Sequence, residues 1–415
     1  MQQTLETDIA IVGGGLVGAS LALALQPLVK REGLKITLLE SHPPSEQQPD
    51  VQWQPSFDAR SSALSWGTRL IYEQLGLWEN LKAHAYPIKH IHVSDRGYLG
   101  STQLNHQEQQ VEALGYVVPN AWLGRTLWEG LQQAGSDSVN VLAPAQIERL
   151  SFPQPEAAEL TGQLDGQAIK LKARLVVLAD GGRSGLKKQL GIADDEHDYQ
   201  QTALVANVRM SRPHQGWAYE RFAEDGPMAL LPLQGRDMAL VWTRPGSEAQ
   251  ALVELPEAEF IQAIQKSFGN RAGRFEQVGE RFAYPLKKIR AKEQVRRNLV
   301  VLGNAAHYLH PVAGQGYNLA IRGVTSLADS LLNSALQARN QGQAFHPGEL
   351  PALQAWQAQR MPDQDAIVGF SHTLIHLFAN NLPLLGHARA AGLIGLNLFS
   401  PARRWLVKKA MGLEV

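Results

Sequence analysis

No cysteine occurs among the 415 residues of this chain, which excludes disulfides, iron–sulfur clusters, zinc–thiolate sites and thiol catalysis. An excess of charge is also missing, since 39 basic residues balance 39 acidic ones, and no basic patch indicates a nucleic-acid partner. No apolar run reaches the roughly 20 residues that a membrane-spanning helix needs. The polar, acidic N-terminus differs from a signal peptide. We therefore expect a soluble, cytoplasmic protein of two or three domains.

A glycine-rich turn follows the first apolar run of the chain. Residues 9–12 form a β-type run, and Gly13, Gly15 and Gly18 then open a small-residue helix. A second β-type run ends at Glu40. In such a βαβ context the glycines permit a tight turn, an approach to a pyrophosphate and close helix–strand packing, while the helix N-terminus faces the phosphates. Glu40 would bind ribose hydroxyls and repel a 2′-phosphate, so the pattern predicts FAD or NAD rather than NADP.

A second motif lies far along the chain, after a β-type run over residues 298–302. Its notable residues are Gly303, Asn304, His307, Pro311, Gly314, Gln315, Gly316 and Asn318. Together with the first motif, it resembles the flavoprotein aromatic hydroxylases, the group typified by para-hydroxybenzoate hydroxylase. Since a nicotinamide dehydrogenase has no reason to carry this segment, the resemblance selects FAD as the dinucleotide.

The resemblance also implies roles within this segment. In the family an acid binds the ribityl chain of FAD, and Asn304 stands in its place here, so a hydrogen bond can remain although the charge is lost. Residues 314–316 would direct backbone N–H groups at the pyrimidine edge of the flavin, where they stabilise negative charge. Asn318 could also reach the flavin, and Pro311 would offer its backbone carbonyl beside the substrate.

His307 belongs to the same segment and has two open interpretations. It could relay a proton from a phenol, or it could be a packing and hydrogen-bonding residue. His307 with His310, and His372 with His376, have metal-like spacing, but neither pair has a third ligand arranged with it. We therefore expect no metal site.

Further cofactor contacts are implied by resemblance. Asp180 and Gly181 follow a β-type run and resemble the Asp-Gly motif that the family associates with FAD and with the nicotinamide cofactor. Arg60 lies in a segment that resembles the one preceding a helix beside the flavin. Arg125 opens a predicted helix whose first turn resembles the family's contact on the pyrophosphate side.

The cofactor motifs must meet in space although long insertions separate them. We therefore predict an α/β fold with a discontinuous Rossmann-like FAD-binding domain, an inserted mixed β-sheet substrate domain and a helical C-terminal region. Apolar patterning predicts strands of the inserted sheet over residues 202–210, 216–222, 228–232 and 238–243. The predicted boundaries are 1–85, 105–184 and 286–345 for the FAD-binding domain, 86–104 and 185–285 for the sheet domain, and 346–415 for the C-terminal region.

Residues 92–97, 283–286 and 376–380 resemble the ubiquinone-biosynthesis branch of the family, and in particular its 2-polyprenyl-6-methoxyphenol hydroxylases. The resemblance implies a monooxygenase that uses NAD(P)H and O2 to hydroxylate a polyprenylated methoxyphenol through a flavin C4a-hydroperoxide. Because one dinucleotide fingerprint is present, NADPH or NADH would bind transiently and leave. Two alternatives remain open: a hydroxylase of another aromatic, and a non-catalytic FAD-binding component of the ubiquinone biosynthetic complex.

The C-terminal region holds an apolar stretch over residues 374–399, followed by Arg403, Arg404, Lys408 and Lys409. An apolar helical surface with a basic fringe could dock peripherally on a membrane that holds a polyprenyl phenol, or on proteins of a ubiquinone-biosynthesis complex. The same pattern is also typical of helices that pack on the FAD-binding domain. Both interpretations stay open on the sequence alone.

Overall fold

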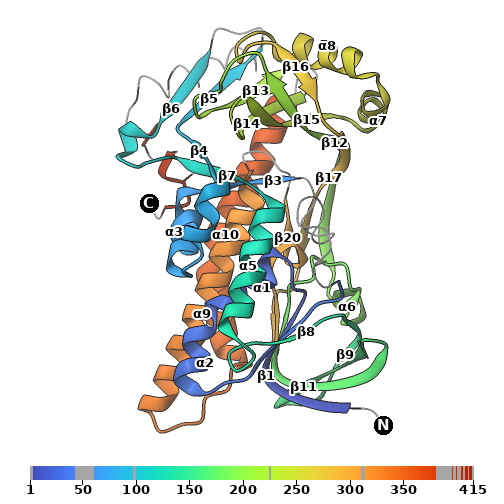
Figure 1. Ribbon diagram of the computed structural model, residues 1–415. Coiled ribbons are helices and arrows are strands. Elements are labelled where there is room, and N and C mark those ends of the chain that lie inside the picture. The colour runs from blue at the N-terminus through green and yellow to red at the C-terminus, as the bar shows by residue number, and fades with distance from the viewer. Residues whose placement is uncertain are drawn as a thin grey trace.

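The computed structural model describes most of the chain, and for residues 374–379 it describes the backbone alone. The described residues are 3–42, 60–96, 100–223, 226–309, 314–379, 395, 399, 403–404, 407–409 and 411–413. Within them, a large sheet flanked by long helices lies below a second large sheet, with a small sheet between the two (Figure 1).

The lower, eight-stranded sheet carries the strands of the predicted dinucleotide fold. β1 (Gln3–Val12) runs parallel to β11 (Gln167–Leu178) on one side and to β2 (Ile36–Leu39) on the other. The carboxyl-terminal parts of these strands are buried, which explains their continuous apolar runs. The other strands are β8 (Asn140–Leu142), β9 (Ala145–Gln154), β10 (Ala157–Leu164), β18 (Val295–Arg296) and β19 (Leu299–Val301).

The carboxyl ends of the parallel strands β2, β1, β11 and β19 meet at one edge of this sheet. Backbone hydrogen bonds of 2.8 to 2.9 Å join the residue after β1 to the end of β2, the residue after β11 to the end of β1, and the residue after β19 to the end of β11. The edge therefore brings together Gly13, Glu40, Asp180 and Gly303. Ligands of open α/β sheets bind at this end of the strands.

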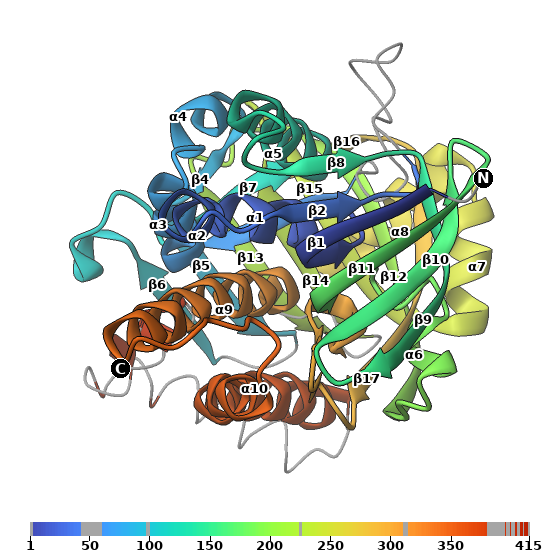
Figure 2. The same ribbon diagram turned by 90° about the horizontal axis from the view of Figure 1, so that it is seen from below.

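Helices cover the lower sheet. α1 (Leu16–Ala24) follows the glycine turn and packs against α5 (Asn120–Ala134) and α9 (Gln315–Asn340). α10 (Leu350–Ala379) lies beside α9, as the view from below shows (Figure 2). The shorter helices are α2 (Gln26–Glu32), α3 (Trp66–Gln74), α4 (Trp78–Leu81) and α6 (Leu186–Gln189), with single 3-10 turns η1 (Lys82–His84), η2 (Gln107–Gln109) and η3 (Gly303–Ala305).

The upper, nine-stranded sheet confirms the predicted fold class. Its centre contains the four strands predicted from apolar patterning: β12 (Asp194–Met210), β13 (Trp217–Ala223), β14 (Gly226–Pro232) and β15 (Asp237–Pro245). The other strands are β5 (His90–Asp95), β6 (Ser101–Asn105), β16 (Phe275–Val278), β17 (Phe282–Ala291) and β20 (His307–Tyr308). α7 (Gly246–Glu254) and α8 (Glu257–Phe268) cover one face of this sheet, around Trp242 and Phe260.

The predicted domain boundaries can be placed on this fold, although the division itself stays a prediction. The boundary at residue 285 falls inside β17, which pairs with β12 on both sides of that point. Of the segment 86–104, β5 and the start of β6 belong to the upper sheet. β4 (Tyr86–Ile88) instead joins β7 (Gly115–Pro119) and β3 (Ser61–Ser65) in the small sheet.

The described part of the C-terminal tail packs on the protein. Val407 and Met411 are buried in a cluster with Leu104 and Leu114, and the N–H of Gly67 donates to the carbonyl of Met411 at 2.8 Å. These residues lie beyond the apolar stretch 374–399, to which the packing and docking interpretations refer. Most of the apolar stretch 374–399 lies outside the described residues or has no described side chains, so its docking stays a prediction. Within the described residues, no helix is long and apolar enough to cross a bilayer.

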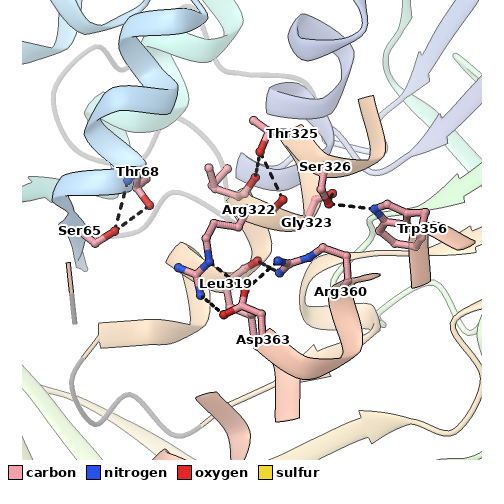
Figure 3. Close-up of polar contacts among 11 residues, drawn as sticks. Ser65, Thr68, Leu319, Arg322, Gly323, Thr325, Ser326, Trp356, Arg360 and Asp363 are labelled. Atoms are coloured by element: carbon pink, nitrogen blue, oxygen red, sulfur yellow. Dashed lines mark hydrogen bonds and ion pairs between the residues drawn. The ribbon is translucent and has the colours of Figure 1, made fainter. Parts of the chain in front are cut away.

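An ion-pair cluster joins α9 to α10. Arg322 donates to both oxygens of Asp363 at 3.0 and 3.2 Å, and Arg360 donates to the same carboxylate at 2.7 Å (Figure 3). Burial alone would raise the pKa of Asp363, but the hydrogen bonds and charges of Arg322 and Arg360 outweigh it and hold that pKa below its ordinary value. The ionised carboxylate therefore stabilises the contact between the two helices.

We expect Asp363→Asn to lower the free energy of unfolding at neutral pH by about 2 kcal/mol, between the values for exposed and fully buried ion pairs, because two guanidinium groups lose their counter-charge. Since the folded-state pKa is depressed, this contribution is present above the unfolded pKa and is lost as the pH falls through the folded pKa. Denaturant titrations at about pH 7 and about pH 3 should show the difference shrinking in acid. Equal differences at both pH values would contradict the assignment. Glu349→Gln, which removes a half-exposed pair with Arg297, is the control.

Candidate active site

One cavity of about 1800 Å³ extends from the carboxyl edge of the lower sheet to the upper sheet. Most of the site residues predicted from the sequence line it: Gly13, Gly15, Glu40, Arg60, Asp180, Gly181, Asn304, Gly314, Gln315, Gly316 and Asn318. Gly18, Arg125, Gly303 and His307 are not among the described residues that line it. Pro311 lies outside the described residues, so its role stays a prediction.

The glycine turn after β1 is shaped by close backbone contacts. A Cβ on Gly13, whose φ is +103°, would lie 2.7 Å from the carbonyl oxygen of Ala179. A Cβ on Gly18 would lie 1.8 Å from the carbonyl oxygen of Gly13. Both glycines therefore allow the turn and helix α1 to pack, whereas Gly15, the N-cap of α1, faces the cavity. This arrangement leaves the helix N-terminus open to a phosphate.

Glu40 is buried at the end of β2 and fixes the same turn. Its carboxylate accepts hydrogen bonds from the N–H of Gly14 and from the N–H of His42, while Trp128 donates its indole N–H to the carbonyl of Gly14. The carboxylate retains lone pairs for further donors, because each oxygen can accept more than one hydrogen bond. Its position at the cavity wall suits ribose hydroxyls.

Asp180 organises the loop after β11. Its carboxylate accepts hydrogen bonds from the N–H of Gly182 at 2.9 Å and from the N–H of Ser184 at 3.0 Å, and also from the hydroxyl of Ser184. Gly181, which follows Asp180, has a φ of +68°. These contacts hold the loop open along the cavity, where Arg183 also lies.

The N-terminus of α9 forms the opposite side of the dinucleotide end. Gly314 caps the helix in the left-handed conformation, with φ at +61°. The buried amide of Asn318 donates to the carbonyls of Gly314 and Ala63 and accepts from the N–H of Ser65, each at 2.8 Å. Asn318 therefore holds the helix start against β3. Among the described residues, a Cβ on Gly316 would meet no atom closer than Leu309 Cβ at 4.0 Å, so a side chain there would enter the cavity.

The geometry of the residues at this end of the cavity fits FAD. A helix N-terminus faces the cavity beside a buried carboxylate, and a second helix N-terminus with a glycine at residue 316 faces the same space. Side chains at Gly13 and Gly18 would close the turn that carries the first helix. Asn304 also lines the cavity, where its amide can bind a hydroxyl.

Comparison with known proteins gives the same result. Residues 6–344 match the family described as FAD binding domain. Ubiquinone hydroxylase UbiL of Rhodospirillum rubrum is 33% identical over 408 residues, which cover 98% of this chain and 89% of that protein. The chain is an FAD-dependent monooxygenase of the ubiquinone-biosynthesis hydroxylase family. The 3-demethoxyubiquinol 3-hydroxylase of Escherichia coli is 31% identical over 413 residues, which cover 98% of this chain and 99% of that protein.

The fold of this hydroxylase is shared more widely than its sequence. The crystal structure of p-nitrophenol 4-monooxygenase from Pseudomonas putida has a TM-score of 0.76 with it at 16% sequence identity, over the whole of both chains. The predicted cofactor is confirmed as FAD, with the NAD(P)H and O2 that are typical of the family.

One predicted site residue of the hydroxylase, Arg125, occupies another position in its helix than expected. The prediction placed Arg125 in the first turn of its helix, but α5 begins at Asn120, directly after Pro119. Arg125 forms an ion pair with Glu129 at 2.8 Å and lies over the ring of Trp122. Asn120 is the member of this helix that lines the cavity. A pyrophosphate contact by Arg125 therefore stays a prediction without support from this geometry.

His307 and Gly303 lie behind the cavity wall. His307 is buried in β20, and burial, followed by the charge of Arg360, lowers its pKa to about 4, so the ring is neutral at pH 7. Gly303 has a φ of +65°, and a Cβ there would lie 3.0 Å from the side chain of Val17 on α1. This arrangement favours the packing interpretation of His307. It gives Gly303 the role of bringing η3 close to the first helix.

The upper-sheet side of the cavity reveals Glu220, which the sequence analysis missed. Glu220 lies on β13 and lines the cavity among apolar side chains. Burial raises the pKa of its carboxyl from 4.5 to about 7. An acid inside an apolar strand between Tyr219 and Phe222 was a signal for an unusual environment, but the sequence did not show which face of the sheet borders the cavity.

We expect Gly15→Val to abolish FAD binding, because Gly15 faces the cavity at the N-terminus of α1 and a branched side chain would occupy the pyrophosphate position. The flavin-to-protein ratio after reconstitution with FAD measures the effect, and circular dichroism checks the fold. Gly369→Val is the matched control, since a Cβ on Gly369 in α10 has no neighbour within 4 Å. Stoichiometric flavin in the Gly15 variant would refute the pyrophosphate assignment.

Glu220→Gln should stabilise the hydroxylase more at about pH 8.5 than at about pH 5, because the raised pKa means that ionising this carboxyl opposes folding. The cost is absent below the ordinary pKa of 4.5 and is complete above about 7. Thermal unfolding of the variant and the parent at both pH values tests this expectation. Glu276→Gln, in an exposed pair with Arg236, should show no such trend. A Tm difference independent of pH would contradict the environment assigned to Glu220.

Proposed function

We propose that this protein hydroxylates the aromatic ring of a polyprenylated methoxyphenol in ubiquinone biosynthesis, using NAD(P)H and O2. The observation that supports this proposal most directly is the cavity. Its dinucleotide end is continuous with an upper part lined by small and apolar side chains of the nine-stranded sheet, including Val93, Ala218, Leu231 and Val241. An apolar site with a few polar groups suits a prenylated phenol.

The prenyl chain needs an apolar route out of the cavity, and α10 offers one. Ala366, Ile367 and Phe370 line the cavity from this helix, and Phe370 remains 39% exposed. Lys409 of the tail also lines it. We propose that the tail of the substrate leaves along this side and that a membrane surface or a protein of the biosynthetic complex meets the protein there. The residues between α10 and the tail lie largely outside the described ones.

Bound FAD would supply hydride acceptance and oxygen activation, and the protein would supply orientation and exclusion of water. The turn at Gly13 and the N-terminus of α1 would hold the pyrophosphate, and Glu40 would hold the ribose. The N-terminus of α9, which Asn318 orients through three hydrogen bonds, places its partial positive charge where negative charge would develop on a reduced flavin. The apolar side chains of the upper sheet would exclude water from the ring of the substrate.

The second candidate is a non-catalytic FAD-binding component of the biosynthetic complex. The observation behind it is Asn304, which lines the cavity where the family pattern has an acid. Loss of that charge leaves the other cofactor contacts in place, including the turn at Gly13, Glu40 and the helix start at Gly314. We therefore favour the active enzyme.

The test is oxygen-dependent NADPH oxidation by the FAD-loaded protein, with and without a geranylated methoxyphenol, followed by the mass of the product. We expect the phenol to accelerate NADPH consumption and to gain one oxygen atom. The methyl ether of the same compound, which lacks the activating hydroxyl, should gain none.

The remaining outcomes separate the alternatives. Faster consumption without added oxygen would show that the phenol binds as an effector and that the true substrate is another aromatic. No NADPH consumption with any phenol, despite stoichiometric FAD, would refute the enzymatic proposal in favour of the non-catalytic component.

A further inference from the structure

Glu220 lies on the cavity-facing side of the upper sheet, on β13 between β14 and β5. Its direct neighbours across the sheet are Val93 on β5 and Ala229 on β14. The row continues on β6 with Thr102 and on β15 with Val241. All of these residues line the cavity, so the carboxyl is surrounded by small, mostly apolar side chains.

The acidic residues that line the cavity differ in their hydrogen bonds. Among the described residues they are Glu40, Asp180 and Glu220. Glu40 holds the glycine turn, and Asp180 holds the loop after β11. Glu220 forms no hydrogen bond or ion pair with another described residue, and burial is the sole cause of its raised pKa. Its carboxyl is therefore available to a ligand, at a place where an unpaired acid costs stability.

A carboxyl in this environment is suited to a neutral donor such as a phenol. Its pKa of about 7 keeps both the acid and the carboxylate populated near neutral pH. A group with such a pKa is an efficient proton acceptor at that pH. A phenol, with an ordinary pKa of about 10, carries one O–H donor that can reach a carboxylate oxygen without bringing a second charge into the apolar site.

We propose that Glu220 is the catalytic base for the ring hydroxyl of the substrate: its carboxylate accepts a hydrogen bond from that hydroxyl and takes the proton as the ring is oxygenated. This inference rests on the proposed function. The O–H bond of the phenol breaks and an O–H bond to the carboxylate forms. The electron pair left on the phenol oxygen enriches the ring, whose carbon forms a C–O bond with the electrophilic oxygen that O2 and FAD reduced by NAD(P)H would provide, while the other oxygen atom leaves as water. The oxygenated ring carbon then loses its proton to water, and the ring oxygen recovers its proton from Glu220.

Other titratable groups also line the cavity. Arg60 lies over the ring of Tyr284 on β17 at 4.9 Å, Lys409 approaches from the tail, and Tyr219 neighbours Glu220 on β13. Arg60 and Lys409 are cationic, and the phenol groups of the two tyrosines are weaker proton acceptors than a carboxylate. Each of them is unchanged in a Glu220 variant, so a pH effect that disappears with Glu220 belongs to this carboxyl.

Binding provides a test that needs no turnover. A geranylated methoxyphenol is titrated into the FAD-loaded protein at about pH 6 and about pH 8, and the flavin absorbance is followed. We expect the parent to bind it about six- to tenfold more tightly at the higher pH. A hydrogen bond to a charged acceptor is worth about 1.5 to 3 kcal/mol, and the ionised fraction of a carboxyl with a pKa of about 7 rises about tenfold between these pH values. Glu220→Gln should show no change with pH, and neither protein should show one with the methyl ether of the phenol. Equal pH dependence in the parent and the variant would refute the proposal.

Turnover provides the second test. We expect Glu220→Gln to lower kcat for hydroxylation by about 100-fold or more, to keep full FAD content, and to lose the rise of kcat through about pH 7 that the parent shows. Glu220→Asp, which keeps the acid but shortens it, should recover part of the rate, and Glu276→Gln should match the parent. A Gln variant with the parent's kcat and pH profile would refute the role. If the parent binds the phenol with the expected pH dependence but adds no oxygen, the proposed function fails while hydroxyl recognition by Glu220 stands.

Discussion

The structure depends on the row of backbone hydrogen bonds that links the carboxyl ends of β2, β1, β11 and β19. These bonds place the glycine turn, the Asp180 loop and the segment after residue 302 at one edge, although long insertions separate them along the chain. At Gly13, Gly18 and Gly303, which lie around this row, a Cβ would come within 3.0 Å of a neighbouring backbone or side chain. Residues without a side chain are therefore required along this row, and the absence of side chains also leaves room for a dinucleotide.

The two faces of the upper sheet explain both a success and a failure of sequence reasoning. Its central strands were predicted correctly, because their apolar runs lie between turn residues. Which side chains meet the substrate could not be predicted, because both faces are apolar. Met228, Leu230 and Trp242 pack under α7 and α8, whereas alternate positions such as Ala229 and Val241 line the cavity. The choice of face is made by helices from a later part of the chain.

Other limits of the sequence have equally physical causes. The first motif predicted Gly13, Gly15 and Glu40 at one site because its spacing encodes a local βαβ unit. Arg125 was misplaced in its helix because the start of α5 is set by pairing of the preceding strand β7 with β3, which is not visible in local sequence. His307 could not be assigned because its burial, together with the charge of Arg360 on α10, lowers the pKa of its ring, and local sequence shows neither effect.

The cavity draws its walls from almost the entire described chain, from Gly13 near one extreme to Lys409 near the other. During synthesis, a nascent chain would therefore expose the apolar face of the upper sheet well before the segments that cover it emerge. Contacts of such high sequence separation fold slowly and leave partly folded intermediates with exposed apolar surface. The architecture that lets one space hold both a cofactor and its substrate thus makes folding of this protein a late, chain-wide event and increases its dependence on chaperones.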